Sequence, residues 1–313
     1  MRARPGTAAL VLVAALGGSA AQAAGQAPDS TPHLDPPPRR SALSVELRTG
    51  GAYWANFLQA PTGAPPKNVQ SGTGEIRLSH PSVAPNLELL GGVGGTWYSE
   101  FDPGWSLFGS ARWDNRLHRM DWSVFFRGRS PRIEVGDTLG FADVVATSAS
   151  YAIRPVRSIQ LRVLAELDRQ SYHRSTERNN RGFRVGGAAR YYGFGYEFSP
   201  EAGATLGNRD VSLDEEDHDE RVLWLTLRST LRPEVYLSLR YRNRFREYTG
   251  RNPASRNLDR RDSRQDLTLT VDVTLSDRWS WTAYLSHQDA HSTNESRIFQ
   301  TQYLLTSVAY RLR

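Results

Sequence analysis

The segment that decides the fold is VYLSLRYRNRFREYT, residues 235–249. Most of its apolar side chains lie at odd-numbered positions, and four even-numbered positions hold Arg240, Arg242, Arg244 and Arg246. On a helix, residues two apart point about 200° away from each other, so both sets would scatter around the axis. On a strand the period is two, so each set keeps one face. The segment is therefore predicted to be a strand with an apolar face and a cationic face.

The same alternation recurs through most of the chain. Apolar residues alternate with polar or small ones in segments 43–48, 145–153, 159–168, 223–231, 266–275 and 304–313. These segments run about 9 to 14 residues, which is longer than ordinary globular strands and suits a tilted membrane strand. The mean hydropathy of −0.54 agrees with this interpretation, because alternating strands average out as polar.

The predicted connections also alternate in length. Short turns lie at Arg154-Pro155, 232–234 and 276–278, and long polar connections lie near 54–72, 172–182, 208–220, 249–263 and 289–300. Short turns at one end and long loops at the other are typical of an outer-membrane barrel. Aromatic residues gather at strand ends, where they suit the headgroup region: Trp97, Tyr98, Trp105, Trp279 and Trp281. The apolar faces are therefore predicted to meet lipid, and the arginines to face a lumen.

We expect an all-β fold, a transmembrane antiparallel β-barrel of about fourteen strands within a range of twelve to sixteen. With both termini in the periplasm, the strands begin near residues 42, 73, 86, 105, 119, 143, 158, 182, 202, 221, 235, 264, 279 and 301. Two regions fit poorly. Residues 129–142 suggest an inward-folded loop or a misread strand pair, and residues 199–207 have no apolar face. Fourteen strands leave room for a narrow channel lined by charge.

The N-terminal region predicts export. Arg2 and Arg4 precede an apolar run at 8–16 and the A-x-A pattern of Ala21-Gln22-Ala23, so residues 1–23 are expected to be a signal peptide. Residues 24–41 read as a proline-rich periplasmic linker and residues 42–313 as the barrel. The chain has no cysteine, which excludes a disulfide framework and a lipoprotein anchor. The predicted location is the bacterial outer membrane.

Both ends of the predicted barrel resemble a known group of proteins. The stretches RTGGAYWANFLQAPTG (48–63) and YLSHQDAHSTNESRIFQTQYLLTSVAYRLR (284–313) are similar to outer-membrane β-barrel proteins associated with exopolysaccharide secretion. In those proteins the first strand leads into an aromatic-Asn-aromatic loop, and a Ser/Thr-Asn loop precedes the last strand. The resemblance implies a barrel that works with polysaccharide-export machinery. This chain departs from the outer-membrane pattern of a final aromatic residue, because it ends on Arg313.

The arginine ladder of residues 240–246 carries the main functional hypothesis. A hairpin closed symmetrically about residue 256 would place Arg246 opposite Asp266 and Arg240 opposite Asp272. Arg242 and Arg244 would then face only threonines, at positions 270 and 268. One interpretation is a lumen held together by cross-strand ion pairs. The other is a positive strip that attracts anionic solute, to which further arginines contribute: Arg162, Arg184, Arg190 and Arg311.

Two charged loops are expected outside the membrane. Residues 214–220, DEEDHDE, lack the glycine and ligand spacing of a calcium loop, which favours a solvated extracellular loop. The basic loop at 251–264 suits lipopolysaccharide phosphates, and an unstructured basic loop explains it nearly as well.

Motifs for catalysis and metal binding are weak. His173 and Ser175 repeat the His-x-Ser spacing of the outer-membrane phospholipase A family, but they lie in a loop without that family's following glycine. His287, Asp289 and His291 do not form a predicted metal site, because residue 291 is expected beyond its strand end. We therefore expect no enzyme, no catalytic residue, no metal, no cofactor and no nucleic-acid partner.

These patterns together predict an outer-membrane channel or export pore with a basic lumen, for an anionic saccharide polymer or small anions. Its expected partners are outer-membrane lipid, lipopolysaccharide and polysaccharide-export machinery. The alternative is a non-conducting structural barrel that binds lipopolysaccharide or partners through its loops. An outer-membrane hydrolase is the third hypothesis.

Overall fold

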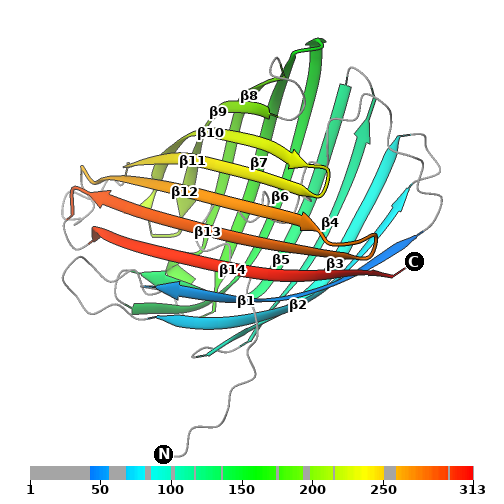
Figure 1. The fold of residues 1–313 in the computed structure, drawn as a ribbon. Coiled ribbons are helices and arrows are strands. Elements are labelled where there is room, and N and C mark those ends of the chain that lie inside the picture. Colours follow the sequence, from blue (N-terminus) through cyan, green and yellow to red (C-terminus); the bar gives the residue numbers. More distant parts are fainter. Residues whose placement is uncertain are drawn as a thin grey trace, which may run out of the picture.

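The computed structural model is a closed antiparallel β-barrel (Figure 1). It describes residues 43–55, 68–81, 86–99, 103–115, 118–134, 137–173, 176–192, 198–213, 216–249, 259–294 and 297–312, without the side chains of 81 and 129–141. The predicted signal peptide and linker therefore lie outside the described residues. Among these residues, no helix has both the length and the apolar character that a membrane span requires.

The described residues form fourteen strands, as predicted. They are β1 (Ser44–Ala55), β2 (Val69–Pro81), β3 (Leu87–Tyr98), β4 (Gly104–Asp114), β5 (His118–Glu134), β6 (Asp137–Val156), β7 (Ile159–Tyr172), β8 (Asn180–Tyr191), β9 (Phe198–Val211), β10 (His218–Arg232), β11 (Val235–Tyr248), β12 (Arg261–Thr274), β13 (Trp279–Ser292) and β14 (Phe299–Leu312). A short 3-10 helix, η1 (Thr176–Arg178), follows β7.

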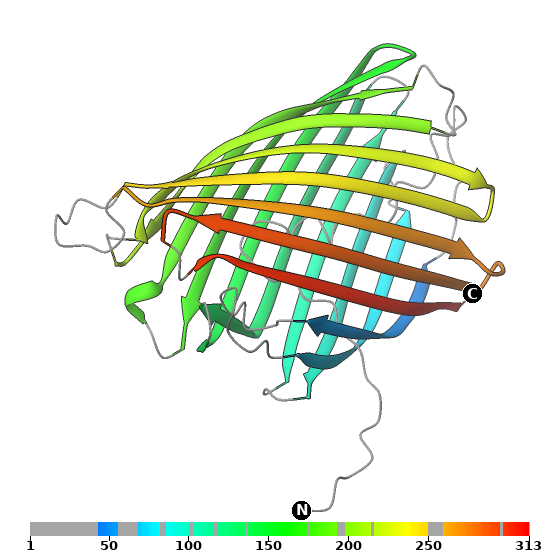
Figure 2. The ribbon, with the colours of Figure 1, turned by 60° about the vertical axis from the view of Figure 1, so that its left-hand side comes forward.

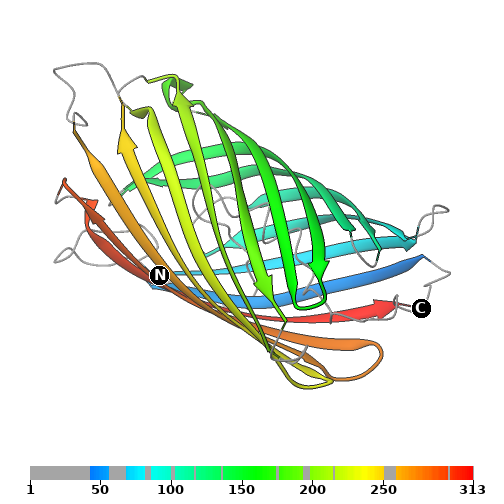
Figure 3. The same ribbon diagram turned by 90° about the horizontal axis from the view of Figure 1, so that it is seen from above.

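Each strand pairs with its neighbours in the chain, and β1 pairs with β14 to close the barrel. Figure 3 shows β1 and β14 side by side, and Figure 2 shows that the strands are strongly tilted within the barrel wall. The C-terminus lies at the end that carries the β10–β11 and β12–β13 turns (Figure 1). β1 ends at Ala55 and β2 begins at Val69 at the opposite end, where β11 also ends at Tyr248 and β12 begins at Arg261. Most connections at this end are longer than the turns at the other end, as predicted, but β5 ends at Glu134 and β6 begins at Asp137.

Both regions that fitted the pattern poorly belong to strands. β5 and β6 pair out to Glu134 and Asp137, so residues 129–142 extend a long hairpin instead of forming an inward-folded loop. Its register shifts beyond Arg127, which explains the broken alternation. Residues 199–207 lie in β9, which pairs with β8 and β10 on its two sides. Its outward positions hold Ala202, Ala204 and Leu206, so β9 has a small apolar face after all.

Alternation assigns the two faces of the wall as predicted. On β11 and β12, Leu239 and Leu269 lie opposite each other and are 40% and 38% exposed on the outer face. Arg244, on the other parity of β11, is only 2% exposed. One aromatic pair on the outer face near strand ends is Trp279 with Tyr310, whose ring centroids are 4.6 Å apart. The outer face therefore suits lipid, and the polar side chains face inward.

The inner surface has two unlike walls. At the middle of β3–β6, inward positions carry mostly small residues, and we call this surface the small-residue wall: Gly92, Gly94, Ser106, Ser110, Ser123, Ala146, Ser148 and Ser150. Two large apolar rings, Phe108 and Phe125, face each other there. Across β7–β11 thirteen inward positions carry a charged side chain, and the wall also holds an apolar cluster of Leu164, Val222 and Trp224.

Candidate functional site

The candidate site is the inward surface of β7–β11, which we call the arginine wall. Its arginines are Arg162, Arg184, Arg190, Arg209, Arg228, Arg240, Arg242, Arg244 and Arg246. Its carboxylates are Glu166, Asp168, Glu201 and Glu220. Because the strand period is two, every second residue of five adjacent strands contributes to one surface. Nine arginines against four carboxylates give the described part of this surface an excess of positive charge.

Glu201 on β9 lies at the centre of the first cluster. Its carboxylate accepts from Arg162 Nη2 at 2.8 Å, Arg190 Nη2 at 2.7 Å and Arg228 Nη1 at 3.1 Å. The indole Nε1 of Trp224 donates to the same carboxylate at 3.4 Å. Only 4% of Glu201 is exposed, so three guanidinium groups share one buried acid. The three cations exceed what this single carboxylate can neutralise.

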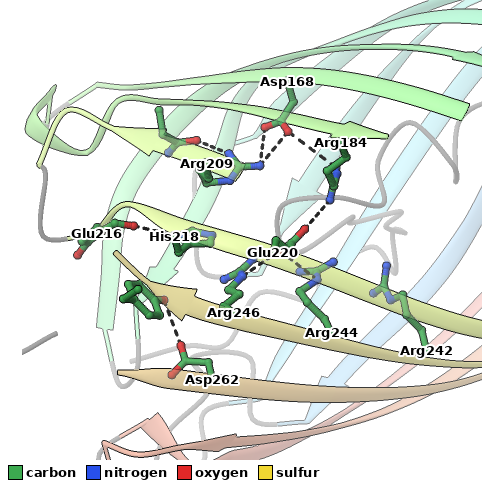
Figure 4. Close-up of polar contacts among 12 residues, drawn as sticks. Asp168, Arg184, Arg209, Glu216, His218, Glu220, Arg242, Arg244, Arg246 and Asp262 are labelled. Atoms are coloured by element: carbon green, nitrogen blue, oxygen red, sulfur yellow. Dashed lines mark hydrogen bonds and ion pairs between the residues drawn. The ribbon is translucent and has the colours of Figure 1, made fainter. Parts of the chain in front are cut away.

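Glu220 on β10 gathers three further arginines (Figure 4). Its Oε1 accepts from Arg184 Nη1 at 2.9 Å, and its Oε2 accepts from Arg246 Nε at 2.9 Å. Arg244 Nε lies 3.4 Å from the same Oε2. Glu220 is 5% exposed. The two clusters therefore repeat one arrangement, a buried carboxylate between arginines of neighbouring strands.

The assignment of residues 214–220 to a solvated loop was therefore wrong for its C-terminal part. β10 begins at His218, and the alternation of this strand turns His218 and Glu220 inward. Residues 214 and 215 lie outside the described residues. Glu216 pairs with Arg178 Nη1 at 3.1 Å, so it also has a protein partner.

A third group of ion pairs extends the Glu220 cluster toward β7 (Figure 4). Arg209 Nη2 donates to both carboxylate oxygens of Asp168 at 2.8 Å. Arg184 Nη2 lies 3.0 Å from Glu166 and 3.8 Å from Asp168. Arg184 thus connects acids on β7 with the acid on β10 and fixes the guanidinium groups in place.

The predicted register of the β11–β12 hairpin was wrong by four residues. Arg242, not Arg246, lies opposite Asp266, and Arg240 lies opposite Thr268 rather than Asp272. The pairing extends to Glu247 and Arg261, so the hairpin is centred two residues earlier than residue 256. Ion pairs favour this register. They join Arg242 Nε to Asp266 at 2.8 Å and Arg261 to Glu247 at 3.3 Å.

The remaining predicted lumen residues have other partners than expected. Asp266 also accepts from Arg264 Nε at 3.2 Å. Asp272 accepts from Thr282 at 2.6 Å, and the guanidinium of Arg240 lies 5.9 Å from the centroid of the Trp224 ring. Arg311 is far from the ladder, on β14, where it lies 3.7 Å from Glu46 of β1.

Part of the basic loop also lies inside the barrel. Arg260 is 4% exposed, donates to Asp262 at 2.9 Å and lies 4.0 Å above the ring of Tyr248. It is therefore not displayed toward lipopolysaccharide. Residues 251–258 lie outside the described residues, so the expectation for their arginines stays a prediction.

The weak catalytic and metal motifs remain weak. His173 Nε2 lies 3.1 Å from Asp143, and Ser175 lies outside the described residues. His291 belongs to β13, in contrast to the prediction, and lies 3.3 Å from Asp289. Within the described ranges, no group of three acidic, histidine or cysteine side chains could hold a metal ion.

Sequence reasoning missed the acids that organise the arginine wall. Glu201 lay in a segment without an apolar face, and Glu220 lay in an acidic run. The available signal was parity, because Glu201, Thr205 and Arg209 keep one face of β9. A guanidinium stays charged at any physiological pH, and a low-dielectric wall strengthens its field. The wall can therefore attract anions.

No protein-family model and no curated protein matches the chain by sequence. Among solved structures, an outer membrane channel from Pseudomonas putida F1 is 11% identical and aligns over 89% of this chain and 100% of that chain, with a TM-score of 0.50. Outer-membrane expressed OmpT of Vibrio cholerae is 9% identical over 87% and 97% of the two chains, with a TM-score of 0.50. At such identities the likeness shows the fold alone. The chain has the fold of bacterial outer-membrane β-barrels, and its apolar outer face agrees with that location.

Proposed function

We propose that the protein is an outer-membrane channel that conducts anions along its arginine wall. The observation that carries this proposal is the pair of buried carboxylates, Glu201 and Glu220, each of which gathers three arginines. Anion pores use rings or rows of arginine and lysine to attract their solute. Here the ion pairs hold the guanidinium groups in position, and their number leaves positive charge in excess.

The proposed solute is an anionic saccharide polymer or a small anion. Arginines on five adjacent strands, from β7 to β11, supply successive cationic positions along one side of the lumen. A chain with repeated carboxylate groups could pair with several of them at once, because guanidinium groups bind carboxylates in a planar, two-point geometry. The small-residue wall carries shorter side chains at the middle of its strands. The resemblance of both chain ends to proteins associated with exopolysaccharide secretion supports the polymer.

One observation favours a second function, a non-conducting structural barrel with loops that bind lipopolysaccharide. Many charged inward side chains are buried and paired, as Arg184 and Glu220 are. Such a network stabilises a lumen as well as it attracts solute. Neither function uses a catalytic residue, and the proposal does not include an enzyme.

The test is the reversal potential of the purified barrel in planar bilayers across a potassium chloride gradient. We expect preference for chloride, and a reduced preference in Arg162→Gln, in which Glu201 keeps two of its arginines. The matched control is Arg112→Gln. It removes an arginine of similar exposure, 25% against 20%, and leaves its partner Asp121 paired with Arg119. A folded barrel that does not conduct would favour the structural function.

Block of the single-channel current tests whether the solute is an acidic saccharide polymer. An acidic oligosaccharide should interrupt single-channel current more strongly than a neutral oligosaccharide of equal length, because it pairs with the arginine wall. Equal block by both would leave an anion channel without a preference for acidic saccharides.

A further inference from the structure

Two arginines face each other directly inside the barrel. Arg244 of β11 and Arg264 of β12 are partners in the strand register, and both point into the lumen. Like charges directly opposite in a sheet destabilise it unless something compensates them. Their neighbours in the register do not repeat this arrangement, because Arg242 faces Asp266 and Arg246 faces Asp262. The pair therefore marks a specific concentration of positive charge.

Arg244 has fewer partners than its burial requires. Its side chain is 2% exposed. Within the described residues, its Nε and Nη2 atoms are buried and have no hydrogen-bond partner. Glu220 Oε2 is 3.4 Å from Nε, but Arg246 donates to that oxygen at 2.9 Å. A buried charged donor without an acceptor costs free energy that an incoming acceptor would recover.

Arg264 does not lack partners, but it shares them. Its Nε donates to Asp266 Oδ1 at 3.2 Å, and its Nη2 donates to the Gln288 side chain. Asp266 also accepts from Arg242. Four arginines, at positions 242, 244, 246 and 264, thus make ion pairs with two carboxylates, Asp266 and Glu220. Glu220 also pairs with Arg184, and Asp262, which faces Arg246, pairs with Arg260. This local excess would be reduced by an anion.

We propose that Arg244 and Arg264 form an oxyanion-binding site that holds one carboxylate, sulfate or phosphate group across the β11–β12 pair. The guanidinium fork matches the two oxygens of such a group, whereas a halide offers no second acceptor. The buried Nη2 of Arg244 supplies a free donor, and Arg264 supplies the facing charge. The site lies in the lumen, so its role in transport rests on the proposed function. To that function it adds a preference for oxyanion groups over halides.

The direct test is binding of sodium sulfate to the refolded full-length barrel in detergent, measured by calorimetry against sodium chloride at equal ionic strength. We expect one saturable sulfate site. Arg244→Lys keeps the charge but removes the fork, so sulfate should bind about tenfold more weakly. Arg264→Gln should weaken it at least as much. Arg112→Gln, on β4, is the control and should bind sulfate as the parent does.

A uronic-acid oligosaccharide separates the two sources of the oxyanion group. Competition with sulfate would mean that the site binds solute carboxylates, and no competition would restrict it to free inorganic oxyanions. If Arg244→Lys does not fold, Arg264→Gln decides. Sulfate binding that is absent, or unchanged in every folded site variant, overturns the site even if the pore conducts. Saturable binding lost in these variants upholds the site even if the pore never conducts.

Discussion

The arginine wall and the small-residue wall line one lumen, yet they meet abruptly between β6 and β7. Ala146 of β6 lies opposite Asp168 of β7, and Ser148 lies opposite Glu166. Asp168 and Glu166 find their cations on β8 and β9, away from β6. An unpaired buried charge is costly, so most arginines of this wall pair with an acid on a nearby strand. Charged side chains therefore occur on contiguous strands, and this group ends at β7, because the facing positions of β6 hold small side chains.

Small residues have different roles in the two walls. Trp224 lies over Gly203 of the adjacent strand, where the ring and the Gly187 carbonyl leave no space for a Cβ atom. The glycine thus makes room for a large ring within the arginine wall. On the other wall, Ser148 and Ser123 make a hydrogen bond of 2.8 Å, and both side chains are short.

The largest expected difference between the walls is in stability. Glu201→Gln removes the buried negative charge that three arginines share, so the free energy of unfolding should fall by about 3 to 5 kcal/mol. Ser148→Ala, on the small-residue wall, removes one neutral hydrogen bond and should cost about 0.5 to 1.5 kcal/mol. Urea unfolding in detergent or lipid vesicles measures both. Similar losses would remove the energetic distinction between the walls.

The definition of both walls depends on which residues face inward. Leu239→Arg and Val271→Arg place a charge on the lipid face, and each should lower the free energy of unfolding in vesicles by about 2 to 4 kcal/mol. Thr270→Arg adds the same side chain at an inward position of β12 and should be tolerated better. Folded fractions on unheated gels report the result. Equal tolerance of all three changes would show that the faces are assigned incorrectly.

A change on the small-residue wall should affect passage without changing charge. Ser148→Phe adds a ring where the lumen is lined by small side chains, so single-channel current should fall while the ratio of anion to cation permeability stays constant. Arg162→Gln should have the opposite effect, with a changed ratio and a nearly constant current. Unchanged current in Ser148→Phe would mean that solute does not pass along this wall.

The smallest expected effect is the response to salt. Screening shortens from about 10 Å at 0.1 M to about 3 Å at 1 M, so anion selectivity should decline as salt rises. Reversal potentials at several salt concentrations measure this decline. Arg162→Gln should flatten the curve, and Arg112→Gln should not. A selectivity independent of salt would point to pore size rather than to the arginine wall.

The fold could be predicted because alternation is a local property of the chain. Leu239 and Arg240 take opposite faces in any register, so strand number and lumen face follow from sequence. Ion-pair partners depend on register, which is set by the length and shape of a loop. A shift of four residues at β11–β12 kept every face correct and changed every partner, so that Asp266 binds Arg242 instead of Arg246.

The clusters at Glu201 and Glu220 were harder to predict, because their members come from several strands. Arg162 on β7 and Arg228 on β10 are far apart in sequence, and only the order of the strands brings them to one acid. Composition also misled at residues 214–220, where a run of acids suggested a loop. The strand boundary at His218 divides that run between the loop and the lumen.

The junction of β1 and β14 has a consequence for how the protein is made. Thr301 donates to the carbonyl of Ala55 across 246 residues of chain, and the two strands pair from Val45 with Leu312 to Ala55 with Gln302. The free edge of β1 is therefore covered only after β14 has been made. Contacts between residues so far apart in sequence make folding slow. Until then, both edges can pair with other chains. A chain that loses β14 would expose the β1 and β13 edges permanently, so translation must be complete before the barrel can close.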